Sequence, residues 1–313
     1  MPTSGSINLT TSRDEIITEA LELLGVLAEG DSPTAAQQTS CARTMNYMIK
    51  AMQADGLNLY ALQLVYLFLQ EAQSSYSLLS TGTDHYTASF TETTTSAASI
   101  SGATTLTVTS ITGISASDKV GVYQADGSVH WTTVNGAPSG STVTLTAALT
   151  AAVASGAVVY AYTTRANRPM RITDVVMHDF SGNKDLPVIH GSREEYFSLT
   201  DKGTDSRVNK IYYDPQVAAP KLFVWPQADD ERDYLKMYIQ RTLEDVDAAG
   251  DLVDYPQEWF LCLAYNLALL LAPKYGKPLA AMTGISALAE REYVRVKDFD
   301  VEPVSVFLAP RNG

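Results

Sequence analysis

The chain has 313 residues, of which 45% are hydrophobic, so it is long and apolar enough to bury a sizeable core. Its formal net charge of −13 argues against tight, sequence-independent binding of nucleic acid, because such binding requires clustered Lys and Arg. The polar N-terminus lacks the pattern of a signal peptide, and the apolar stretch 260–272 is shorter than the ~20 residues that cross a bilayer. We therefore expect a soluble protein without a membrane partner.

Two amphipathic helical patterns occupy the first 60 residues. Thr11 and Ser12 offer an N-cap for the first helix, and Ser32-Pro33 precedes a second helix that runs to about Ala54. The apolar stripe of the first helix contains Ile16, Ile17, Ala20, Leu21, Leu24 and Leu27, and that of the second contains Cys41, Met45, Met48, Ile49 and Met52. Both helices are therefore expected to cover a shared core.

The far end of the chain carries the longest apolar run, 256–276. It begins at Pro256 and ends at Pro273 and Gly276, which are typical helix boundaries. A helix that is apolar on nearly every side is expected to be buried from all directions. A fourth long helix is predicted over 278–297. We expect Trp259, Leu263, Leu267 and Leu270 to face Ile17, Leu21, Leu24, Met45 and Met48.

The middle of the chain is rich in predicted strands. Strand patterns include Lys210–Asp214, Lys221–Trp225 and Tyr234–Arg241, and Ser192 with Glu195 has the spacing of a helix capping box. Residues 91–164 differ from their surroundings, because they are almost free of charge and rich in Thr, Ser, Ala and Gly. Asp126-Gly127 is typical of a hairpin turn there. This block reads as an inserted module of about five short strands.

Together these patterns predict an α+β protein. Its expected parts are a discontinuous four-helix domain from both chain ends, and a β-rich middle region that carries an inserted small β-barrel or sandwich module. The helical domain comprises 1–60 and 256–297, the β domain 61–90 and 165–255, and the inserted module 91–164. Residues 298–313 form a C-terminal tail. Cys41 and Cys262 lie on helices expected to pack together, where two buried thiols or a disulfide between them would both fit.

No pattern of catalytic residues stands out. The histidines His85, His130, His178 and His190 are scattered, and neither a phosphate-binding glycine loop nor a G-x-S-x-G motif is present. The run 229–233 has carboxylates that Ca²⁺ could use, but its spacing matches no known loop, and a solvated turn is favoured. Carboxylates such as Glu194 and Asp229 give only a weak glycosidase signal. We expect neither an enzyme nor a metal, cofactor or catalytic residue.

Several short motifs, taken in order, resemble one family. They include Asn167-Arg-Pro-Met-Arg-Ile172, Arg193-Glu-Glu-Tyr-Phe197, Tyr212-Tyr-Asp-Pro-Gln216, Leu222-Phe-Val-Trp-Pro226 and Tyr255-Pro-Gln-Glu-Trp-Phe260, with further segments at 67–78, 121–133 and 267–276. Their order and spacing are similar to the head-to-tail adaptor proteins of short-tailed bacteriophages, also known as tail accessory or packaged-DNA-stabilisation proteins. The resemblance covers nearly the whole chain. The smallest adaptors of this type are mainly helical, and the large β region departs from that pattern.

The resemblance implies a structural connector. Such a protein forms a ring of identical subunits, commonly twelve, beneath the portal at the head–tail junction of the virion, after assembly in the host cytoplasm. Its expected partners are the portal protein, a tail tube, nozzle or tail fibre protein, and copies of itself. Double-stranded DNA would pass through the channel without sequence-specific binding. The negative charge suits that passage, because it repels the DNA backbone.

The tail 298–313 is our candidate for portal docking. Helical periodicity ends after Lys297, and Pro303 and Pro310 disfavour a further helix. The proposed docking residues are Phe299, Val301, Val304, Val306, Phe307, Leu308 and Arg311, of which the apolar ones suit an added strand or a groove. Alternatively, the tail folds back on its own subunit.

Two other functions stay open at this point. A host-surface-binding or decoration protein of the virion could use the Thr- and Ser-rich module, with exposed aromatic residues such as Trp131 and Tyr123 stacking on sugars. Packing within a barrel explains these aromatic residues equally well. A virion cell-wall hydrolase has only the abundance of carboxylates in its favour.

Overall fold

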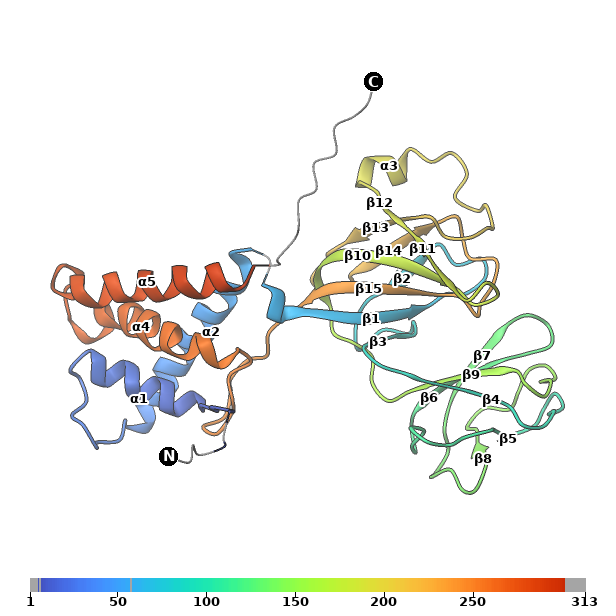
Figure 1. Cartoon of the computed structure of the whole chain (residues 1–313), viewed down its shortest axis with the longest axis horizontal. Coiled ribbons are helices and arrows are strands. Elements are labelled where there is room, and N and C mark those ends of the chain that lie inside the picture. Colours follow the sequence, from blue (N-terminus) through green and yellow to red (C-terminus); the bar gives the residue numbers. More distant parts are fainter. Residues whose placement is uncertain (1–4, 6, 57, 302–313) are drawn as a thin grey trace. The chain divides into compact units, whose positions relative to one another are not determined.

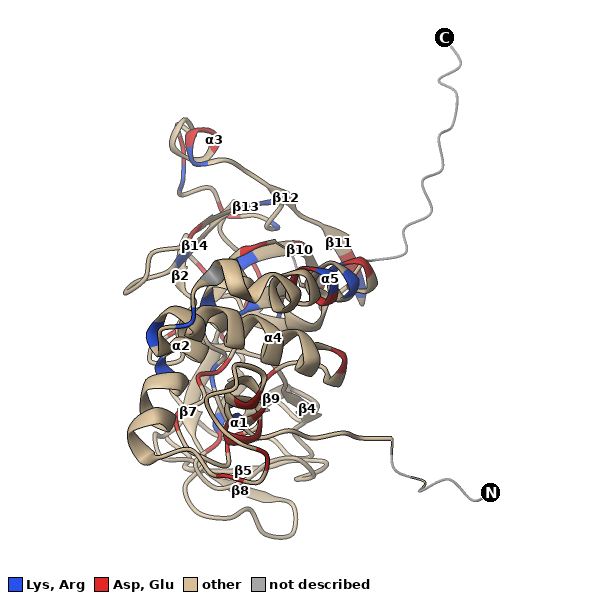
Figure 2. Cartoon of the chain, turned by 90° about the vertical axis from the view of Figure 1, so that its left-hand side faces the viewer, with Lys and Arg blue, Asp and Glu red and all other residues tan. Residues whose placement is uncertain are grey.

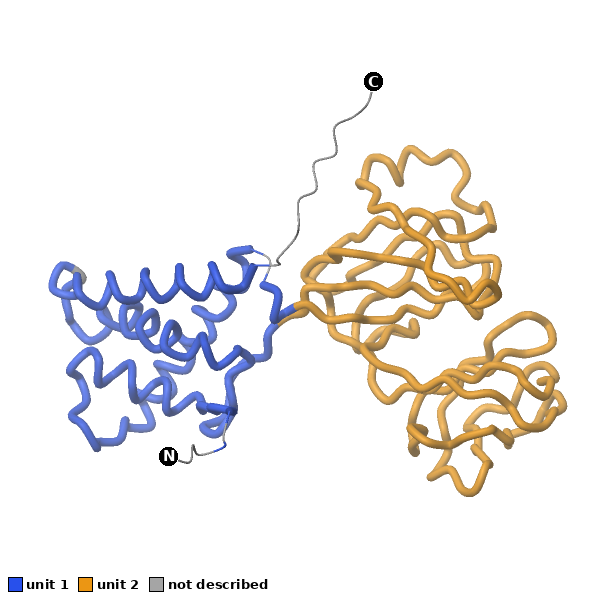
Figure 3. Tube along the Cα trace, in the orientation of Figure 1, with its two compact units in different colours: residues 1–61, 243–313 blue, residues 62–242 orange. Residues whose placement is uncertain are grey.

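The computed structural model describes residue 5, residues 7–56 and residues 58–301, in which helices and several sheets combine (Figure 1). The predicted α+β class is confirmed. The chain divides into two compact units, which we call the helical unit (1–61 and 243–313) and the β unit (62–242) (Figure 3). Both ends of the chain therefore contribute to the helical unit.

The helical unit contains the long helices. These are α1 (Arg13–Leu23), α2 (Ala35–Ala54), α4 (Phe260–Leu271) and α5 (Thr283–Phe299), with short 3₁₀ turns at Leu59–Ala61, Gln257–Trp259, Ala272–Tyr275 and Leu279–Met282. Capping boxes start the first two helices. The side chains of Ser12 and Thr34 each accept from the backbone N–H of the residue three positions on, and the side chain of that residue accepts from the backbone N–H of the cap. The Ser12 cap agrees with the sequence. The second helix begins after Thr34 rather than at Ser32-Pro33.

The core of the helical unit joins residues far apart in sequence. Trp259, Leu263 and Leu267 lie in one buried cluster with Ile17, Leu21, Leu24, Met45 and Met48. The prediction was wrong for Leu270, whose side chain is 49% exposed. Leu261 is also 47% exposed, so α4 is not buried from all directions. The helix contacts α1, α2 and α5, and these neighbours leave part of its circumference open.

Two further observations concern the boundaries and thiols of this unit. Residues 243–255, expected in the β domain, belong to the helical unit, where Val246 and Tyr255 are buried in the core. Cys41 and Cys262 are buried free thiols, so the disulfide alternative was wrong. Burial raises the pKa of the Cys262 thiol to about 12, which keeps it protonated and unreactive.

Two facing sheets build the larger part of the β unit. One has the order β11 (Lys184–Pro187), β10 (Pro169–Asp179), β15 (Tyr234–Arg241), β1 (Leu62–Phe68) and β3 (Tyr86–Thr87), and the other β12 (Ile189–His190), β13 (Lys210–Asp214), β14 (Lys221–Trp225) and β2 (Ser75–Ser77). Their inner faces share one hydrophobic core. The predicted bounds of β13, β14 and β15 are confirmed, as is the capping box that starts α3 (Arg193–Phe197).

Residues 91–164 form a separate set of strands. A four-stranded sheet has the order β4 (Thr91–Thr94), β9 (Val158–Tyr162), β6 (Lys119–Tyr123) and β7 (Val129–Thr133), and β5 (Thr105–Thr107) pairs with β8 (Thr142–Thr144). The block encloses its own core. The predicted turn at Asp126-Gly127 is present, since the Gln124 N–H donates to the Ser128 carbonyl at 2.8 Å and Gly127 has φ +92°.

An aromatic cluster links this block to the rest of the β unit. Phe68 of β1 is only 1% exposed, and its ring centroid lies 4.8 Å from that of Tyr160 and 5.0 Å from that of Trp131. Tyr234 of β15 and Phe90 belong to the same cluster. Glu231 adds polar contacts, because it accepts from the backbone of Val129. The block has its own core but shares this second one.

We expect Leu267→Ala to destabilise the helical unit by roughly 2–5 kcal/mol, because Leu267 is fully buried and its truncation leaves a cavity. Leu270→Ala is the matched control on the same helix and should cost about 0.5 kcal/mol. Urea unfolding followed by helical circular dichroism measures both. Equal losses for the two variants would contradict the observed burial.

Replacement of 91–164 by a short Gly/Ser linker tests how separable this block is. The sequence alone predicts a folded product. The shared aromatic cluster leads us to expect that the deleted protein binds a hydrophobic dye and aggregates, because Phe68 and Tyr234 lose their cover. The same deletion with Phe68→Ser should be more soluble. Equal solubility of the two deletions would show that the cluster does not limit separability.

Candidate docking surfaces of the helical unit

Two of the predicted docking residues are described by the structure, and both are exposed. Phe299 is 78% exposed and Val301 is 63% exposed. Val304, Val306, Phe307, Leu308 and Arg311 lie outside the described residues. Helix α5 ends at Phe299 rather than at Lys297, so the tail begins later than predicted. Phe299 is therefore held on a helix, which fixes the direction of an apolar side chain before the tail starts.

Polar contacts fix the last turns of α5 against the end of α2. Lys297 Nζ donates to the Asp55 carbonyl at 2.8 Å, and the Tyr293 hydroxyl lies 2.8 Å from an Asp55 carboxylate oxygen. The Leu59 N–H donates to the Asp300 carboxylate at 3.0 Å. Burial raises the pKa of Asp300, and this hydrogen bond acts in the opposite direction. These contacts hold the last described residues of the chain against the end of α2.

A groove borders this point, and we call it the α4–α5 groove. It encloses about 520 Å³ and is lined by Glu258, Leu261, Glu292, Arg295, Val296 and Phe299. Glu292 is only 4% exposed and forms ion pairs with Arg291 at 2.7 Å and Arg295 at 3.3 Å. The hydrogen bond from Arg291 keeps the pKa of Glu292 below its usual range. The groove has apolar lining residues and a charged edge, on which Glu292 is paired with arginines.

A second groove lies on the other side of Leu261, and we call it the α1–α4 groove. It encloses about 440 Å³, and its lining residues are Leu9, Thr10, Thr11, Glu15, Ile16, Glu19, Phe260, Leu261 and Ala264. The Leu9 N–H donates to the Gln257 side chain at 3.1 Å, which places Leu9 beside the start of α4. Glu15 and Glu19 are exposed and make the rim acidic. Sequence reasoning missed both grooves, because α4 reads as apolar on every side.

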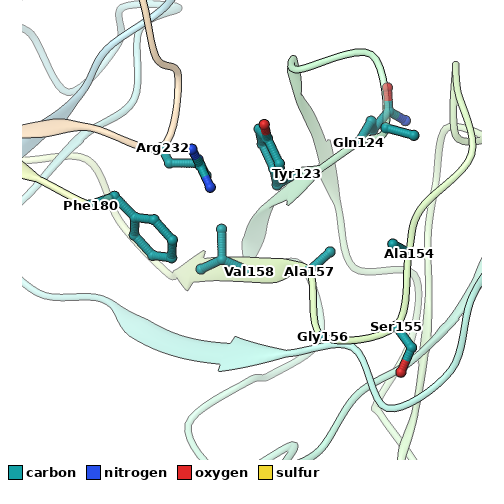
Figure 4. Close-up of a pocket in the computed structure, with 10 residues that line it drawn as sticks. Tyr123, Gln124, Ala154, Ser155, Gly156, Ala157, Val158, Phe180 and Arg232 are labelled. Carbon is teal, nitrogen blue, oxygen red and sulfur yellow. The ribbon is translucent and has the colours of Figure 1, made fainter. Parts of the chain in front are cut away.

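The aromatic residues considered for sugar binding are not free. The Trp131 ring stacks on His85 with centroids 3.7 Å apart, and Arg232 lies 4.7 Å from the centroid of the Tyr123 ring. Figure 4 shows Tyr123, Phe180 and Arg232 around a small pocket of about 230 Å³. The guanidinium there already pairs with Asp230 at 2.6 Å. Trp131 and Tyr123 are half-buried, because His85 stacks on the Trp131 ring and Arg232 lies over the Tyr123 ring.

The acidic run 229–233 is less solvated than predicted. Asp233 is only 3% exposed and accepts from the Phe180 N–H at 2.8 Å, and Asp230 pairs with Arg232. Among the described residues, no group of three or more His, Cys, Asp or Glu is arranged to hold a metal ion. The run therefore serves as an internally bonded connection before β15. Within the same residues, no helix is long and apolar enough to cross a membrane.

No protein-family model matches the chain, and no curated protein matches it significantly.

The acidic run makes stability depend on pH. Burial, with a smaller effect from Asp230, raises the pKa of Asp233 to about 6, above its value of 3.8 in an unfolded chain. The folded state therefore holds the proton of Asp233 more tightly than the unfolded chain does. The contribution of Asp233 to the free energy of unfolding should be highest below pH 4 and fall as the pH rises to 6. Asp233→Asn keeps the acceptor oxygen and should stabilise the protein at pH 7 by on the order of 2 kcal/mol.

Chemical denaturation between pH 4 and pH 8 measures this effect. The difference between Asp233→Asn and the unchanged protein should grow between pH 4 and 6 and then level off. Glu29→Gln, at an exposed position of the helical unit, is the control. A difference that does not vary with pH would contradict the assigned titration.

Proposed function

We propose that the protein is a structural head-to-tail adaptor of a phage virion, which forms a ring beneath the portal and helps to retain packaged DNA. The motif resemblance suggests this role. The observation that carries it is the exposed apolar surface of the helical unit around Leu261 and Phe299, which the apolar stretch 304–308 follows closely in sequence. An exposed apolar patch with a charged edge is typical of a protein interface.

The parts of the chain have separate roles in this proposal. The four long helices from both chain ends form one discontinuous domain that contacts the portal and neighbouring subunits. The β unit, with 91–164 as an inserted small barrel or sandwich, extends towards a tail tube, nozzle or fibre protein. Double-stranded DNA passes through the ring without sequence-specific contacts, which the net charge of −13 favours. No enzymatic step is involved, and the site of action is the head–tail junction.

The alternative role, a host-surface-binding or decoration protein, receives less support. That role was suggested by two aromatic rings in the inserted block that were expected to be exposed. Trp131 is stacked on His85, and Arg232 covers Tyr123, so neither ring has both faces free for a sugar. Both rings are half-buried, which weakens the specific reason for that role.

The portal-docking experiment uses the full chain and a chain that ends at Val301. This end keeps the Asp300 contact with Leu59, which a shorter chain ending at Lys297 would lose. We expect the shortened protein to bind purified portal rings at least about tenfold more weakly, because it lacks the apolar residues 304–308. Phe299→Ser should also weaken binding, and Tyr238→Ser, at a 48% exposed aromatic residue of the β unit, should not.

Cosedimentation measures the affinity, and electron microscopy of the complex counts the copies around the portal. Undiminished binding by a folded shortened chain would exclude the tail as the main contact. If the full chain forms no ring on the portal, the adaptor proposal fails.

A further inference from the structure

One helix of this acidic protein carries only positive charge. Helix α2 contains Arg43 and Lys50 but neither Asp nor Glu, and the connection 272–282 adds Lys274 and Lys277, again without an acid. Lys274 Nζ bonds to Ser40 and Thr44, so this connection lies against α2. Figure 2 shows the basic residues on α2 and the adjoining loop, and acidic residues on α1. The helical unit therefore has a positive face and a negative face.

The positive face also presents an aromatic side chain to solvent. Tyr47 is 68% exposed, and with Arg43 and Lys50 it falls at positions i, i+4 and i+7, which share one side of a helix. We call these three residues the α2 face. Lys50 pairs with Asp245 at 2.8 Å, whereas Arg43 makes no ion pair among the described residues. An open tyrosine beside an unpaired arginine has the composition of an interface.

The α1–α4 groove has the complementary properties. Its floor contains Ile16, Phe260 and Leu261, and its rim carries Glu15 and Glu19. The only basic residue of α1 is Arg13, which is buried and paired with Asp14 at 2.8 Å, so the rim charge is not balanced from within the helix. A groove with an apolar floor and an acidic rim fits an aromatic side chain flanked by cations.

We propose that the α2 face of one copy docks in the α1–α4 groove of a second copy, with Tyr47 against Leu261 and Arg43 beside Glu19. We assign the groove to a second copy of this chain, because the chain itself carries both the α2 face and a groove of complementary charge and apolar character. This inference rests on the proposed ring-forming function and names the contact that would build the ring.

The two patches differ from each other, which decides the kind of assembly. A contact between unlike patches is heterologous, so each subunit uses its α2 face on one side and its groove on the other. Such contacts close into a ring when the rotation permits, whereas like patches would give a two-fold dimer. Phe299 and Val301 are not part of the proposed subunit contact, and Leu261 borders both this contact and the α4–α5 groove.

A charge exchange tests the contact. Arg43→Glu and Glu19→Lys each place like charges together, and we expect each alone to weaken self-association at least about tenfold. Glu19 is preferred over Glu15 because Glu15 belongs to the capping box of α1. The variant that carries both changes should recover assembly. A 1:1 mixture of the two single variants should also recover it, because both kinds of contact in an alternating ring are then matched.

Tyr47→Ala should also weaken assembly, and the charge exchange at Arg43 and Glu19 should not restore it. Arg171→Glu, at an exposed position of β10 in the β unit, is the matched control and should assemble like the unchanged protein. Circular dichroism verifies that each variant is folded. Sedimentation velocity of the full-length proteins at low and high salt measures self-association, and electron microscopy on portal rings counts bound copies.

Three outcomes would overturn the proposed contact. The single variants could assemble like the unchanged protein, or folded single variants could fail to assemble both in the double variant and in the 1:1 mixture. The third outcome is that self-association recovers in these samples but no ring forms on the portal. Loss of binding of Arg43→Glu to a DNA duplex, with unchanged self-association, would assign the α2 face to DNA instead. Failure of the adaptor proposal looks different. The unchanged protein would then not bind the portal, while charge exchange would still control its self-association.

Discussion

The burial of α4 is the constraint on which the rest of the structure depends. This helix is almost entirely apolar, so it is unstable until other helices cover it. The cover comes from α1 and α2 at the opposite end of the chain and from α5, with Leu263 and Leu267 fully buried among them. Because the two ends must meet, everything from 62 to 242 is inserted between two parts of one folded unit.

The neighbouring helices cover α4 incompletely, and the exposed part of α4 belongs to the surface that carries the proposed function. Leu261 stays half exposed between two grooves, one bordered by α1 and the other by α5. An apolar side chain that is exposed to water costs free energy in an isolated subunit. Burial of this side chain against a partner would remove that cost. The two grooves differ in charge, since Glu292 is paired with arginines in one and Glu19 is open at the rim of the other. Two different partners can therefore use the two sides of Leu261.

The β unit shows a second solution to the same problem of burial. The block 91–164 has a small core of its own and relies in addition on the aromatic cluster around Phe68. Buried groups around that cluster are held by specific partners. His85, for example, bonds to the Tyr162 hydroxyl at 2.8 Å, and burial lowers its pKa to about 3, so the imidazole stays neutral. The aromatic residues that could have bound sugars are instead used to attach the block.

The sequence by itself determined the local structure wherever one pattern dominated. Capping boxes at Ser12 and Ser192 set helix starts, alternation set the bounds of β13 to β15, and Asp126-Gly127 set a hairpin, because each depends on neighbours within a few residues. Only the tertiary structure decided which side of α4 stays open, as its periodicity does not distinguish Leu267 from Leu270. It also decided that Trp131 stacks on His85 and that Asp233 is buried and accepts from the Phe180 N–H, because these partners are distant in sequence and no local pattern indicates them.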